Sequence, residues 1–107
     1  MLTLTTTTGA AGRTIALDGE LDHQTVPRLH EALAGLRLAP GERLVVELSA
    51  LTFCDSSGLA GFLAAHEAAS AAGAGITLAN PPRVLMRMLR FTGLDSVFDT
   101  EGAAATG

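Results

Sequence analysis

Hydrophobic and polar positions at the start of the chain predict a pair of strands. Residues 2–8 begin with alternating Leu and Thr and are rich in β-branched Thr, which is typical of an edge strand. Residues 9–12 form a turn, and Arg13–Asp18 reads as a second strand. Because the connection is short, the two strands should form an antiparallel hairpin. Residues 19–22 then break the strand pattern.

An apolar stripe predicts a helix over residues 24–38. Its large residues follow one another at a 3-4-3 spacing, which places them along one side of a helix: Val26, Leu29, Leu33 and Leu36. Pro27 falls within the first turn, where its missing N–H has no cost, and Pro40-Gly41 ends the unit.

The second half of the chain alternates strands with helices. Arg43–Leu48 is almost continuously apolar, which is typical of a strand covered on both faces. A loop, Ser49–Asp55, leads into a helix over about residues 57–72. The remaining predicted elements are a strand at 76–79, a helix from Pro81-Pro82 to about Thr92, a short edge strand at Val97-Phe98, and a disordered tail at 101–107.

This order predicts an α/β fold made of one domain over residues 1–100. Strand–helix–strand units call for right-handed crossovers, so the sheet should be mixed but mostly parallel and packed against helices. The N-terminal strand should be antiparallel at one edge.

Composition narrows the class of partner. The 107-residue chain has 11 acidic residues, seven Arg, no Lys, and neither Trp nor Tyr, which argues against nucleic-acid binding. A single Cys excludes an internal disulfide framework and fits a reducing compartment. The N-terminus lacks the features of a signal peptide, and the longest apolar run, 58–65, is far shorter than the roughly 20 residues of a membrane-spanning helix. We therefore expect a cytoplasmic protein without a membrane partner.

Polar chemistry is concentrated where the third strand leads into the second helix. Asp55, Ser56 and Ser57 are residue types that cap helices, so the segment has a purely structural explanation. Alternatively, one serine is a regulated hydroxyl, because a phosphate there would meet the positive end of the helix. Spacing alone leaves both explanations open.

Two motifs in register resemble a known family. GELDHQT (19–25), followed by FCDSSGL (53–59), resembles the anti-sigma factor antagonist family, which is built on the STAS domain. Residues 81–98 are similar to the family's third helix and closing segment, so the resemblance covers about residues 2–98. Two departures are Glu47, where the family often has Asp or Asn, and the absence of the usual C-terminal helix.

The resemblance implies a regulatory function and specific residues. Ser56 would be phosphorylated by a serine kinase that is also the anti-sigma factor, and a serine phosphatase would reverse the modification. The unphosphorylated protein would bind that kinase and so release a sigma factor. The implied partner-binding residues are Asp22, His23, Asp55, Ser56, Ser57 and Gly58. The alternative is a STAS interaction module of a stress-signalling or lipid-transport complex that is not regulated by serine phosphorylation.

Other candidate sites are weaker. Three His and Cys54 lack the spacing of metal ligands, and we expect His66 to pack in the core. Ser56 and His66 would lie about 15 Å apart along a helix, too far for a catalytic pair. We therefore expect no enzyme activity, cofactor or metal. In the third helix, Arg83, Arg87 and Arg90 share an arc of about 60°, which fits either a solvated face or an accessory partner contact.

Overall fold

The computed structural model describes residues 1–10 and 12–102 and shows the predicted α/β class. Its elements are β1 (Leu2–Gly9), β2 (Gly12–Leu21), α1 (Val26–Ala34), β3 (Arg43–Cys54), α2 (Ser56–Ala71), β4 (Gly75–Ala79), α3 (Arg83–Thr92), the 3-10 turn η1 (Leu94–Ser96) and β5 (Asp99–Glu101). They form a five-stranded sheet in the order β1-β2-β3-β4-β5. β1 is antiparallel to β2 and the other pairs are parallel, as the sequence predicted.

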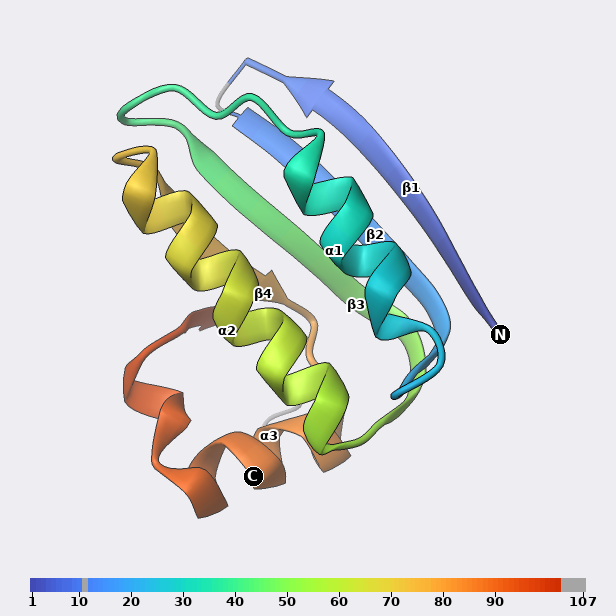
Figure 1. Cartoon of the computed structure of the whole chain (residues 1–107). Coiled ribbons are helices and arrows are strands. Elements are labelled where there is room, and N and C mark those ends of the chain that lie inside the picture. The colour runs from blue at the N-terminus through green and yellow to red at the C-terminus, as the bar shows by residue number, and fades with distance from the viewer. Residues whose placement is uncertain (11, 103–107) are drawn as a thin grey trace.

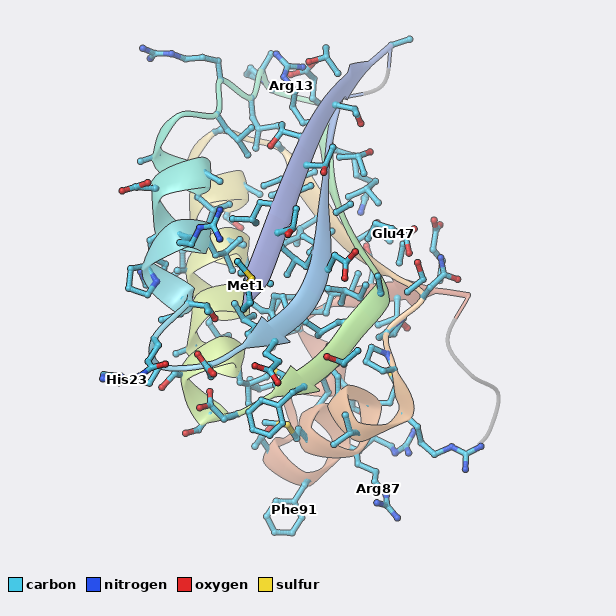
Figure 2. The ribbon with its side chains drawn as sticks, turned by 90° about the vertical axis from the view of Figure 1, so that its right-hand side faces the viewer. Met1, Arg13, His23, Glu47, Arg87 and Phe91 are labelled. Atoms are coloured by element: carbon cyan, nitrogen blue, oxygen red, sulfur yellow. The ribbon has the colours of Figure 1, made fainter. Side chains whose placement is uncertain are left out.

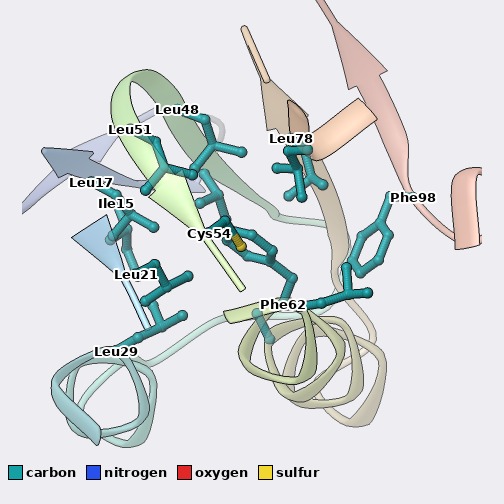
Figure 3. Close-up of a cluster of buried hydrophobic side chains, with 14 of the residues drawn as sticks. Ile15, Leu17, Leu21, Leu29, Leu48, Leu51, Cys54, Phe62, Leu78 and Phe98 are labelled. Carbon is teal, nitrogen blue, oxygen red and sulfur yellow. The ribbon is translucent and has the colours of Figure 1, made fainter. Parts of the chain in front are cut away.

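The helices α1 and α2 cover one face of the sheet, and the core lies between them and the strands (Figure 1). Leu29 of α1 and Phe62 of α2 are fully buried against this face (Figure 3). The opposite face carries partly exposed side chains such as Thr14, Val45 and Glu47, and Figure 2 shows no described helix over it. α3 lies at the end of the sheet where β3 finishes.

Both central strands are longer than the sequence predicted. β2 continues through the residues that were predicted to break it and ends at Leu21, and β3 continues through the predicted loop to Cys54. Two shifts of register, between Ala16 and Asp18 and between Gly19 and Glu20, absorb the irregular residues while the pairing goes on. The positive φ of 113° at Gly19 is one part of that adjustment.

The prediction that β3 is covered on both faces was wrong. Leu44, Val46 and Leu48 are buried, whereas Val45 and Glu47 between them are only partly so. A one-sided cover produces this alternation, since successive side chains of a strand point to opposite faces. Val45 is apolar without being part of the core.

The remaining boundaries differ in detail. α1 is shorter than predicted and is capped by Gly35, although Leu36 and Leu38 still pack on the core. α2 matches its prediction closely, and α3 ends at Gly93 with a φ of 79°. The last strand is β5, Asp99–Glu101, and not Val97-Phe98. Phe98 directly precedes this strand and is buried in the core. Glu101 belongs to that strand and not to a disordered tail, and the rest of the predicted tail, 103–107, lies outside the described residues.

Glu47 has a structural function in this chain. Its carboxylate accepts hydrogen bonds from Asn80 Nδ2 at 3.0 and 3.1 Å and from the Ser49 N–H at 3.0 Å. Asn80 has a positive φ of 52°, and its own N–H donates to the Glu101 carbonyl. Glu47 therefore links β3 to Asn80, which directly follows β4 and is hydrogen-bonded to β5. Desolvation acts to raise the pKa of Glu47, but hydrogen bonds from Asn80 and Ser49 outweigh it and hold the pKa below its ordinary 4.5.

The lowered pKa of Glu47 predicts a contribution to acid stability. A carboxyl with a depressed folded-state pKa stabilises the fold above its unfolded-state pKa, and this contribution is lost as the pH falls through the folded value. Glu47→Gln should therefore be less stable than the wild type at neutral pH, with a difference that shrinks between about pH 6 and pH 3. Urea denaturation across this range measures it. The control is Glu67→Gln on the exposed side of α2, whose curve should parallel the wild type; a constant difference for Glu47→Gln would contradict the assignment.

Candidate functional site

The two motifs meet at the carboxyl ends of β2 and β3. Leu21 pairs with Cys54 as the last residue of each strand, and the Asp55 N–H donates to the Leu21 carbonyl at 3.3 Å. The loop after β2 and the start of α2 consequently leave the same edge of the sheet side by side. In α/β sheets this is the edge where functional groups gather. Residues some thirty positions apart in the sequence are thus brought together, as the family resemblance implied.

Asp22 organises the loop that leads into α1. Its Oδ1 accepts hydrogen bonds from the Gln24 and Thr25 N–H groups at 3.0 and 3.1 Å. The Thr25 hydroxyl donates to the Glu20 carbonyl at 2.8 Å and accepts from the Asp22 N–H at 2.9 Å. Desolvation acts to raise the pKa of Asp22, but hydrogen bonds from Thr25 and Gln24 lower it below the ordinary value. The carboxylate therefore stays charged at neutral pH.

His23 lies at the turn of the same loop and is exposed. Figure 2 shows its side chain pointing away from the molecule on the side of α1.

Asp55 is the N-cap of α2. Its backbone is extended, and its Oδ1 accepts from the Gly58 N–H at 3.0 Å. Ser56 is the first residue of the helix and is exposed, while Ser57 is half-buried in the same turn. Asp55 is therefore the cap of α2, and Ser56 is an exposed residue of its first turn.

Gly58 locks the two loops against each other. It is buried, and a Cβ at this position would lie 2.6 Å from Cys54 Sγ and 2.9 Å from the Leu21 carbonyl oxygen. Only glycine lets α2 begin so close to the end of β2. Gly58, which was predicted among the partner-binding residues, is buried, and it brings the start of α2 close to the end of β2.

Cys54 is a buried thiol beneath the site. Burial raises its pKa to about 12, with a further contribution from Asp55. The thiolate, which is the reactive form, is therefore negligible at neutral pH. Among residues 1–10 and 12–102, no group of three or more His, Cys, Asp or Glu could hold a metal ion.

His66 is half-buried and packs against the core residue Phe98, so it lies at the margin of the core rather than within it as predicted. Its ring meets that of Phe98 edge to face, with centroids 5.7 Å apart and an interplanar angle of 78°. An aromatic pair of this geometry stabilises a core.

The basic residues of α3 lie at the same end of the molecule. Arg83, Arg87 and Arg90 are exposed, and Figure 2 shows Arg87 and Phe91 projecting into solvent. Phe91 is 94% exposed. The sequence analysis missed it, although a helical step of 100° puts Phe91 only about 80° from Arg83. Val84, next to Arg83 in the chain, is 45% exposed.

No helix in the described part of the chain is long and apolar enough to span a bilayer. The most apolar helix, α2, instead buries one side against the sheet.

The fold and site define a domain with a helix-covered mixed sheet and a polar loop-to-helix face at one edge. A family model described as "Mlab, STAS domain" matches residues 4–99, and the chain belongs to this family. The identification confirms the resemblance drawn from GELDHQT and FCDSSGL.

Known relatives share the architecture and a common description. The anti-sigma-B factor antagonist of Listeria monocytogenes is 28% identical over 85 residues, which are 79% of this chain and 75% of that protein. An anti-sigma factor antagonist from Mycobacterium paratuberculosis has a TM-score of 0.73 and 26% identity, covering 94% of this chain and 86% of that one. The anti-sigma factor antagonist SpoIIAA in its unphosphorylated form has a TM-score of 0.65 and 20% identity, covering 91% of this chain and 97% of that one.

The packing around Gly58 predicts a local loss of stability on substitution. Gly58→Ala should lower the free energy of unfolding by about 1–3 kcal/mol, because backbone and thiol must move to admit the methyl group. Chemical denaturation measures the change. Gly35→Ala is the matched control, since its Cβ would meet only the Ala32 and Glu31 carbonyl oxygens at 3.7 and 3.8 Å. A Gly58→Ala midpoint equal to that of the wild type would mean that the loops are not held this tightly.

Proposed function

We propose that this protein is an anti-sigma factor antagonist that acts through a switch face made of Asp22, His23, Asp55, Ser56 and Ser57. In this proposal the unphosphorylated face binds an anti-sigma factor that is also a serine kinase, and binding releases a sigma factor. The observation that carries the proposal is the exposed Ser56 hydroxyl on the first turn of α2, directly beside the Asp22 loop. The descriptions of the Listeria and Mycobacterium relatives support the same function.

Position explains how a phosphate on Ser56 would act. The first N–H groups of a helix have no acceptor within the helix, and Asp55 takes that of Gly58. A phosphate on Ser56 would meet the positive end of α2, so the fold can carry it. It would also add a charge of about −1.5 to −2 beside Asp55. A partner that must desolvate this face would then bury an unmatched dianion, which costs several kcal/mol.

The protein acts by binding in this proposal, and it turns over no substrate. A serine phosphatase would restore the unphosphorylated state, and the exchange would take place in the cytoplasm. The buried, unreactive Cys54 and the packed His66 fit this assignment, because neither offers a nucleophile or base at the face.

Substitution of Ser56 tests the switch. Ser56→Ala should keep partner affinity and resist inactivation, and it should change stability little, because Asp55 rather than Ser56 caps the helix. Ser56→Asp should weaken binding at least about tenfold, equal to about 1.4 kcal/mol, with a melting temperature near the wild type. Calorimetry against the cognate kinase measures both.

The phosphoacceptor itself is identified by mass spectrometry after incubation with that kinase and ATP. Wild type and the control Ser57→Ala should carry one phosphate on Ser56, and Ser56→Ala should carry none. Phosphate on Ser57, or on neither serine, would overturn the assignment.

Charge at Asp22 should contribute to partner binding. Asp22→Lys would reverse the charge and weaken binding, but it would also remove the acceptor that holds the loop. Asp22→Asn is the sharper variant, since its side-chain oxygen can still accept from Gln24 and Thr25. We expect about tenfold weaker binding, less dependence on salt and a slightly lower melting temperature, because the loop N–H groups lose the charged carboxylate that they stabilise. Undiminished affinity in Asp22→Asn would restrict Asp22 to its structural function.

The second candidate is a STAS module of another assembly without serine phosphorylation. The matching family model favours it, because its description names Mlab and not an anti-sigma factor antagonist. Co-purification from the native cell distinguishes the two: a serine kinase bound to the switch face supports the first candidate, and transporter or stress-complex subunits support the second.

A further inference from the structure

From Leu4 to Thr8, the free edge of β1 has no feature that would prevent pairing with another strand. Natural proteins protect such edges with charged side chains, proline or bulges. β1 has the sequence LTLTTTTG, without charge or proline, and its register with β2 runs without a shift from Leu2–Gly19 to Gly9–Gly12. It is a regular edge strand of eight residues with high β-propensity.

The hydrogen-bond phase of the hairpin shows which groups face outward. The Glu20 N–H donates to the Met1 carbonyl at 3.0 Å, so Met1 and Glu20 are a hydrogen-bonded pair. Such pairs alternate along an antiparallel ladder. The odd-numbered residues of β1 therefore bond to β2, and the even-numbered ones direct their N–H and C=O groups away from the sheet.

One of these outward groups is already occupied within the chain. The Arg28 guanidinium of α1 donates to the Leu2 carbonyl, which closes the N-terminal end of the edge. The outward backbone groups of Leu4, Thr6 and Thr8 lie beyond this contact. The edge thus has a defined open stretch centred on Thr6.

We propose that a second copy of this chain occupies this stretch, with β1 pairing antiparallel to β1 about a two-fold axis at Thr6. In that register Leu4 lies opposite the other copy's Thr8, and Thr6 lies opposite itself. Every outward group from 4 to 8 is then paired, and the Arg28 contact is left intact. The two sheets join into one, and the interface is isologous, as in most dimers.

Side chains and helices both fit this arrangement. Thr5 lies opposite Thr7 on the open face, and Thr–Thr neighbours across strands are favourable. Two uncharged strands meet without like-charge repulsion. Figure 1 shows α1 in front of β2 and not beyond β1, so the helices of the two copies stay apart. The open stretch pairs with Arg13–Leu17 of β2, away from the switch face, so the dimer does not depend on the proposed function.

Sedimentation equilibrium over concentrations up to about 1 mM tests the dimer. The wild type should shift from the mass of one chain to that of two. Thr6→Glu places two negative side chains directly opposite each other, on Cα atoms about 5.5 Å apart across the axis, and should remain monomeric, with an unchanged fold by circular dichroism. Thr6→Val, which keeps β-propensity without charge, should still dimerise. A wild type that stays monomeric throughout, or a Thr6→Glu that dimerises equally, overturns the proposal.

Oxidative cross-linking tests the register. Thr6→Cys should form a disulfide-linked dimer, because opposite residues at the axis have Cα atoms within the range that a disulfide spans. Thr5→Cys is the matched control: its two copies are diagonal neighbours about 7–8 Å apart and should not link. The native thiol contributes little, since Cys54 is buried with a pKa raised to about 12. Equal cross-linking of both variants would show random collision and contradict the register.

Discussion

Pairing of β2 with β3 as far as Leu21 and Cys54 is the constraint on which the site depends. It holds the ends of both strands at one edge, and the hydrogen bond from Asp55 N–H to the Leu21 carbonyl extends it into the first residue beyond the sheet. Gly58 then lets α2 start directly against this junction, where any side chain would collide with Cys54 and Leu21. Without the close approach, the Asp22 loop and the first turn of α2 would be separate surfaces.

The polar residues at this junction differ in whether they hold the backbone. One carboxylate oxygen of Asp22 accepts hydrogen bonds from backbone N–H groups of its own loop, and one of Asp55 accepts from a backbone N–H of α2. Ser56, which follows Asp55 directly in the chain, is exposed. A modification there changes charge at a face whose backbone is already held by other residues. In the proposed function, this arrangement lets a phosphate on Ser56 alter binding and leave the fold in place.

Sequence periodicity predicted the class of fold, the antiparallel N-terminal strand and, within one residue at its start, the helix α2, because these follow from local apolar spacing and short connections. It did not predict that β2 and β3 continue to Leu21 and Cys54. The residues concerned, 19–21 and 49–54, include Gly and Ser, and only tertiary pairing across two irregularities keeps them in the sheet. For the same reason, the sequence did not predict that Leu21 of the first motif contacts Cys54 and Asp55 of the second. Only the family resemblance, and not the spacing, indicated Ser56 rather than Ser57 as the candidate phosphoacceptor. The structure then showed that Asp55 is the helix cap.

Residue type alone also gave incomplete information on the surface. Val45 and Val84 are apolar yet partly or largely exposed, because helices cover only one face of the sheet and one side of α3 is free. Phe91 lies with the arginines on that free side. Its exposure depends on how α3 docks at the end of the sheet, which periodicity does not specify.

Amide chemical-shift mapping by NMR tests the central claim most directly, namely that the two loops act as one face controlled by Ser56. On titration of the unphosphorylated protein with its cognate anti-sigma kinase, the amides of residues 22–25 and 55–58 should shift together. After phosphorylation of Ser56 both sets should stop responding, while the amides of β3 and β4 keep their positions. Shifts confined to one loop, or an undiminished response of the phosphorylated protein, would contradict the account.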